Sequence, residues 1–92
     1  MLTDLIPTGR TITRAELARA ANTSDREIRR AIHDLRMAGH PIVSHSSGRG
    51  YSMAADRAEI EAFCREQESR AMDLMAVAAR MREAAEKEDN NV

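Results

Sequence analysis

The strongest constraint on the fold of this chain is a pair of helix-start signals that lie close together. Thr13-Arg14-Ala15-Glu16 and Ser24-Asp25-Arg26-Glu27 each place a glutamate three positions after a hydroxyl residue. In such a capping box, the hydroxyl and the carboxylate accept hydrogen bonds from backbone amides that the first helical turn leaves free. The spacing predicts helices over about residues 14–21 and 25–38, joined by a very tight turn. Asn22 suits that turn because asparagine tolerates the left-handed backbone conformation.

A shorter helix is expected before this helix pair. Leu2, Leu5 and Ile6 share one helical face, and Pro7 ends the helix because proline disfavours helical conformation in the residue before it. We expect these three apolar side chains to contribute to the core. Residues 10–13 follow as a brief extended segment.

A β-hairpin is expected after the helix pair. Gly39 is a helix stop signal, and two short strand-like runs follow it at residues 41–45 and 50–54. The runs are separated by Ser46-Ser47-Gly48-Arg49, which is made of turn-forming residues and an arginine. The hairpin therefore has a polar, basic tip, and Tyr51 is interpreted as one of its core residues.

The predicted helix 25–38 has two distinct faces. Ile28, Ala31, Ile32 and Leu35 have the i, i+3, i+4, i+7 spacing of one buried stripe. With that stripe toward the core, the helical period turns a mostly basic face toward solvent. This outward face contains Arg26, Arg29, Arg30 and His33.

Charge is divided unequally along the chain. Residues 1–54 hold eight arginines and five acidic residues, for a net charge of +3, whereas residues 55–92 hold six basic and ten acidic residues, for −4. All the basic residues except Lys87 are arginines, whose planar guanidinium suits phosphates and guanine edges. The basic first part favours a nucleic-acid partner.

Several other classes of protein are disfavoured by the sequence. No apolar run approaches the roughly 20 residues of a membrane span, and the single cysteine, Cys64, indicates a reducing compartment, so we expect a cytoplasmic protein. The spacings of Cys64 and the three histidines match no usual metal site, and no catalytic constellation is evident. We therefore expect no enzyme activity and no cofactor. With only Tyr51 and Phe63 aromatic, stacking platforms for single strands are lacking.

Residues 1–54 resemble the winged helix-turn-helix domains of biotin-repressor and DeoR-like regulators and of small phage-encoded DNA-binding proteins. The resemblance is carried by residues 12–18, 24–32 and 39–51. Asn22 stands where the family commonly has glycine, and Thr23 where it commonly has an aliphatic residue. The resemblance implies a mainly α fold with a small β-hairpin wing, and double-stranded DNA as the partner.

In such a domain, the helix 25–38 faces the major groove, where arginine can bind guanine O6 and N7. Arg26 and Arg30, one turn apart, are the first candidates for base contacts. Arg29 and His33 are candidates for base or phosphate contacts. Ser24 at the helix start, with Arg10 and Arg14, is a candidate for phosphate contacts. The hairpin tip is expected along the DNA backbone or in the minor groove, through Ser46, Ser47 and Arg49. The competing interpretation is an ordinary solvated face, with Asp25, Glu27 and Asp34 pairing locally with the arginines.

A long helix is predicted over residues 55–88, with a disordered tail at 89–92. Asp56-Arg57-Ala58-Glu59 is a third capping pattern, and no glycine or proline follows it. Mostly apolar residues recur along this helix at alternate spacings of four and three, which is a heptad seam, and Phe63 and Met75 widen it. This seam predicts a homodimer through a coiled coil. In the alternative, only the first turns through Phe63 pack on the winged domain and the rest frays. The seam residues are Ile60, Cys64, Gln67, Ala71, Leu74, Ala78, Met81 and Ala85.

Two functions remain open from the sequence. The first is a DNA-binding protein that regulates transcription or serves as a phage-type replication or recombination accessory factor. The second is a protein interaction module, in which the winged domain is a scaffold and the acidic helix docks a partner protein.

Overall fold

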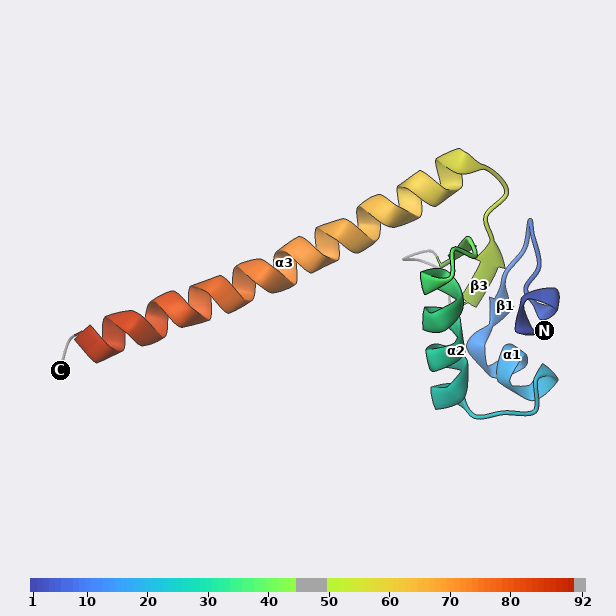
Figure 1. Cartoon of the computed structure of the whole chain (residues 1–92), viewed down its shortest axis with the longest axis horizontal. Coiled ribbons are helices and arrows are strands. Elements are labelled where there is room, and N and C mark those ends of the chain that lie inside the picture. The colour runs from blue at the N-terminus through green and yellow to red at the C-terminus, as the bar shows by residue number, and fades with distance from the viewer. Residues whose placement is uncertain (45–49, 91–92) are drawn as a thin grey trace.

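The computed structural model describes residues 1–44 and 50–90. The helices and strands of residues 2–53 lie together, and the long carboxyl-terminal helix extends away from them (Figure 1). The predicted fold class, a mainly α winged helix-turn-helix with a long helix after it, is confirmed. In chain order the elements are η1 (Leu2–Leu5), β1 (Ile12–Thr13), α1 (Arg14–Ala20), α2 (Asp25–Met37), β2 (Ile42–Val43), β3 (Gly50–Met53) and α3 (Arg57–Asn90).

Helix α1 begins and ends as its sequence predicts. The Thr13 hydroxyl accepts a hydrogen bond from the Glu16 amide at 3.1 Å, and the Glu16 carboxylate accepts one from the Thr13 amide at 3.3 Å. At the other end Asn22 has a φ of +52°. The Thr23 amide donates to the Ala18 carbonyl at 2.9 Å, which closes a Schellman motif. This motif makes the turn to α2 tight.

Helix α2 begins with half of the predicted capping box. The Ser24 hydroxyl accepts a hydrogen bond from the Glu27 amide at 3.2 Å. In a full capping box the Ser24 amide would donate to the Glu27 carboxylate. Here that carboxylate instead accepts a hydrogen bond from the Thr23 hydroxyl. Thr23 thus makes a polar contact at a position where winged helix-turn-helix domains of this kind commonly have an aliphatic residue. Gly39, with a φ of +97°, follows the end of the helix as predicted.

The wing is a three-stranded antiparallel sheet in the order β1-β3-β2. The predicted hairpin strands pair through Ile42 with Met53 and Val43 with Ser52. The extended segment before α1 adds β1 as a third strand, with Thr13 opposite Gly50. A Cβ on Gly50 would meet the Ile12 carbonyl group, so β1 approaches β3 this closely only because residue 50 is glycine.

The core lies between the helices and the sheet. Leu17 of α1, Ile28 and Ile32 of α2, Ile42 of β2 and Ile6 after η1 form one buried cluster. Half-buried apolar side chains, Tyr51 and Leu35 among them, pack against this cluster. The expectation for the first helix is wrong in one respect: Leu5 is 39% exposed, whereas Ile6 is buried and Leu2 packs against the core.

Helix α3 is a single long helix that leaves the rest of the fold (Figure 1). The Asp56 carboxylate caps it by accepting from the Glu59 amide at 2.9 Å, and the Glu59 carboxylate accepts from the Ala55 amide at 2.9 Å. Among the described residues, the contact between α3 and the domain lies at the start of the helix, where Phe63 is half-buried. Figure 1 shows the remainder of α3 extending away from the other elements.

Candidate nucleic-acid interface

The face of α2 opposite the core carries the side chains that the sequence predicts for DNA contact. Ile28 and Ile32 are 1% and 2% exposed, which fixes the rotation of the helix. Arg26, Arg30 and His33 are exposed on the other side. Within residues 1–44 and 50–90, neither Arg26 nor Arg30 takes part in an ion pair. These two guanidinium groups therefore have their donors directed to solvent.

Met37 extends the same face and was not singled out from the sequence. It lies one turn beyond His33 and is 76% exposed. Its helical position is the signal that would have identified it, because residues 26, 30, 33 and 37 follow the same i, i+4, i+7, i+11 stripe. The solvent face of α2 is thus basic along most of its length and apolar at its end.

A second group of side chains is tied together at the start of α2. The Asp25 carboxylate accepts a hydrogen bond from the Arg14 guanidinium and pairs with Arg29 Nε at 3.2 Å. The hydrogen bond to Asp25, followed by one to Tyr51, raises the pKa of Arg14. Arg14 and Arg29 therefore lie beside a carboxylate that partly offsets their charge, as the local-pairing interpretation foresaw for Asp25. All three side chains keep substantial contact with solvent.

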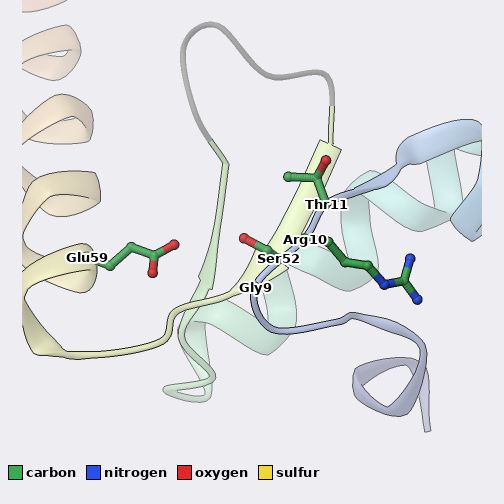
Figure 2. Close-up of a pocket in the computed structure, with 5 residues that line it drawn as sticks. All are labelled: Gly9, Arg10, Thr11, Ser52 and Glu59. Carbon is green, nitrogen blue, oxygen red and sulfur yellow. The ribbon is translucent and has the colours of Figure 1, made fainter.

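The other predicted contact residues are distributed more widely. Ser24 is exposed at the amino terminus of α2, with its hydroxyl engaged as the helix cap. Arg10 lies on the loop before β1, and Figure 2 shows its guanidinium directed away from Glu59 of α3. The predictions on the wing tip, Ser46, Ser47 and Arg49, lie outside the described residues.

A small pocket separates the loop before β1 from the first turn of α3. Gly9, Arg10, Thr11, Ser52 and Glu59 line it (Figure 2). Ser52 is buried, and the Glu59 carboxylate is engaged by the Ala55 amide. The carboxylate that lines the pocket is therefore already hydrogen-bonded, and the Arg10 guanidinium is directed away from it.

Arg36 has a role that the sequence did not reveal. Its Nε donates to the Ile42 carbonyl at 2.8 Å, and its guanidinium lies 4.6 Å from the ring centre of Phe63 and 5.8 Å from that of Tyr51. Burial lowers the pKa of Arg36. The side chain connects α2, the wing and α3, so it belongs to the structure of the domain and not to the solvent-facing arginines.

The predicted seam of α3 lies largely in solvent. Ile60 and Ala78 are half-buried, whereas Leu74 and Met81 are 73% and 68% exposed. Phe63, expected to widen the seam, instead packs on Arg36. The remaining seam residues, Cys64, Gln67, Ala71 and Ala85, are exposed.

No group of three or more histidine, cysteine, aspartate or glutamate side chains in residues 1–44 and 50–90 is arranged to hold a metal ion. None of the helices in the same residues is both long enough and apolar enough to cross a membrane.

Comparison with known proteins identifies the family. A model of the HTH domain matches residues 2–52, more than half of the chain and all of the fold that carries the exposed arginine face. Neither a curated protein nor a solved structure matches the chain. Domains of this family bind DNA and are typically not catalytic. The chain therefore belongs to the HTH domain family, a winged helix-turn-helix family that includes regulators of the DeoR and biotin-repressor types.

Proposed function

We propose that this protein is a sequence-specific double-stranded DNA-binding protein that regulates transcription and reads the major groove with α2. The observation that carries the proposal is the solvent face of α2, where Arg26 and Arg30 are exposed and unpaired within the described residues. An α-helix fits the width of the major groove, and each guanidinium can donate two hydrogen bonds to guanine O6 and N7.

The surrounding side chains suit contacts to the DNA backbone. Ser24 lies at the start of a 13-residue helix, where free amides and the helix dipole attract a phosphate. Arg14 and Arg29 are held in place by Asp25, which orders them and lowers their net charge. We assign these two arginines, Arg10 and the wing residues Ser46, Ser47 and Arg49 to phosphate or minor-groove contacts, and His33 to a base or a phosphate.

The test compares single alanine variants with a matched control. A bound sequence is first selected from a random duplex pool, and binding is then measured by fluorescence anisotropy. Arg26→Ala and Arg30→Ala should each weaken binding to the selected site by about 1–3 kcal/mol, which is roughly 5- to 150-fold. Arg80→Ala removes the same charge from an exposed position of α3 and should change affinity much less.

Salt dependence separates base contacts from phosphate contacts. Arg49→Ala should weaken binding to all duplexes alike and reduce the slope of log affinity against log salt by about one. Unchanged affinity after replacement of Arg26, Arg30 and Arg49 together would exclude this surface. Absence of retention of random duplex at low salt would instead favour the interaction-module function, in which α3 docks a partner protein.

The regulated process is a separate question. A regulator changes transcription from a promoter that contains the selected site, whereas a phage-type replication or recombination accessory factor binds DNA without that effect. A reporter gene placed behind the selected site distinguishes these two functions, and Arg26→Ala provides the control for binding through α2.

A further inference from the structure

An apolar side chain ends the basic stripe of α2. Met37 is 76% exposed with α3 in place, and it is the only large apolar side chain exposed on this helix, which the structure describes throughout. At 3.6 residues per turn, Met37 lies within about 40° of Arg26, Arg30 and His33 around the helix axis. A ligand that both arginines contact therefore faces Met37 as well.

The charges around Met37 favour a base over a phosphate as its partner. Asp34 is exposed one turn before Met37, and no ion pair involves it within residues 1–44 and 50–90. A carboxylate there repels phosphates, but it can accept a hydrogen bond from the amino group of cytosine. The neighbouring Arg36 is engaged by the Ile42 carbonyl and by Phe63, so it is not available to a phosphate. Base edges therefore suit this end of α2 better than the DNA backbone does.

We propose that Met37 is a specificity-determining residue that packs on the C5-methyl group of a thymine in the major groove. The inference deepens the proposed function and rests on it. Thymine presents a methyl group in the major groove, and apolar side chains contact it there. The unbranched thioether of methionine adapts readily to a small apolar partner. Arg26 and Arg30 thus select guanines, and Met37 adds selection for one A·T pair.

The spacing of these residues along α2 sets the place of the thymine in the site. Met37 lies about 10.5 Å beyond Arg30 along the helix axis, at a rise of about 1.5 Å per residue. In zinc fingers, which also place a helix in the major groove, side chains about three residues apart contact successive bases. The thymine should therefore lie about two base pairs beyond the guanine that Arg30 contacts, with His33 facing the base pair between them.

Removal of the methyl group from the DNA tests this contact. Each thymine of the selected site is replaced singly by uracil, which pairs in the same way and lacks only the C5-methyl group. At one position, about two base pairs from the guanine whose selection Arg30→Ala relaxes, uracil should weaken binding of the wild-type protein about 3- to 5-fold. Uracil at the other thymines of the site is the matched control and should change the affinity less.

Protein variants show whether Met37 is the partner of that methyl group. Met37→Ala should weaken binding to the thymine site about 3- to 10-fold and should bind the thymine and uracil duplexes equally. Met37→Leu keeps a large apolar side chain and should retain most of the preference for thymine. Met72→Ala removes the same side chain from a position of α3 that is 70% exposed, and it should leave the preference unchanged.

Two results would overturn the inference while the proposed function stands. One is a selected site with no thymine at this distance from the guanine, and the other is a uracil penalty that persists in Met37→Ala. In both cases the wild-type protein still binds its site and Arg26→Ala still weakens that binding. Failure of the proposed function is a different result, because the wild-type protein then retains no duplex at all and both proposals are excluded together.

Discussion

The close approach of β1 to β3 yields a sharp prediction for Gly50. A Cβ at this position would meet the Ile12 carbonyl oxygen and lie 2.8 Å from the Ile12 carbonyl carbon and 3.2 Å from Thr13 Cα. These are backbone atoms, which cannot rotate away, so Gly50→Ala must separate the two strands or shift α1, which begins directly after Thr13. Overpacking of this kind costs about 1–3 kcal/mol, and a weakened strand hydrogen bond adds about 1 kcal/mol.

We therefore expect Gly50→Ala to lower the free energy of unfolding by about 3 kcal/mol, and the Tm by roughly 10–25 °C. Tyr51 is the only tyrosine in a chain without tryptophan, so near-ultraviolet signals report directly on the wing during thermal and urea unfolding. Gly39→Ala is the control: its Cβ would meet no atom within 4 Å, and the cost of its φ of +97° is about 1–2 kcal/mol. If Gly50→Ala destabilises the protein no more than Gly39→Ala, the close strand contact is refuted.

Three further predictions concern the polar contacts of the winged domain. Asp25→Asn releases Arg14 and Arg29 from their shared carboxylate, so binding to random duplex at low salt should tighten several-fold while stability falls by less than about 1 kcal/mol; weaker binding would contradict an interface at this place. The Thr13 hydroxyl and amide lower the pKa of Glu16, so its contribution to stability is complete above the unfolded pKa and is lost as pH falls through the lower folded value. The difference in urea midpoint between wild type and Glu16→Gln should accordingly shrink in acid, and a constant difference would show that the carboxylate charge is not involved. Arg36→Met removes the Ile42 hydrogen bond and the contact with Phe63, so it should cost about 1–2 kcal/mol and speed amide exchange over residues 57–63, whereas unchanged exchange would show that Arg36 does not hold α3.

The features that the sequence predicts correctly depend on neighbours within one or two helical turns. The capping box at Thr13 and the left-handed Asn22 are local, because each involves residues at most a few positions apart. The same holds for the buried stripe through Ile28 and Ile32, which in turn places Arg26 on the opposite face. This is why the orientation of α2 follows from the sequence.

The features that the sequence misses depend on contacts between distant segments. The pairing of β1 with β3 joins residues far apart in the chain, and nothing within Ile12–Thr13 specifies that partner. In the sequence, Arg36 is one more arginine on the same helix as the solvent-facing arginines. Its structural role becomes visible only when folding brings Ile42 and Phe63 next to it. The contact between Arg14 and Asp25 likewise crosses the turn between the helices, whereas that of Asp25 with Arg29 follows the i, i+4 spacing.

The position of β3 determines how mechanical force enters the molecule. β3 is the central strand of the sheet, and residues 54–56 alone separate it from α3. A pulling force on the far end of α3 therefore reaches the sheet through β3, the strand that pairs with both β1 and β2. Extraction of β3 would release β1 and β2 together, so resistance to stretching depends on the wing strands before it depends on α1 or α2.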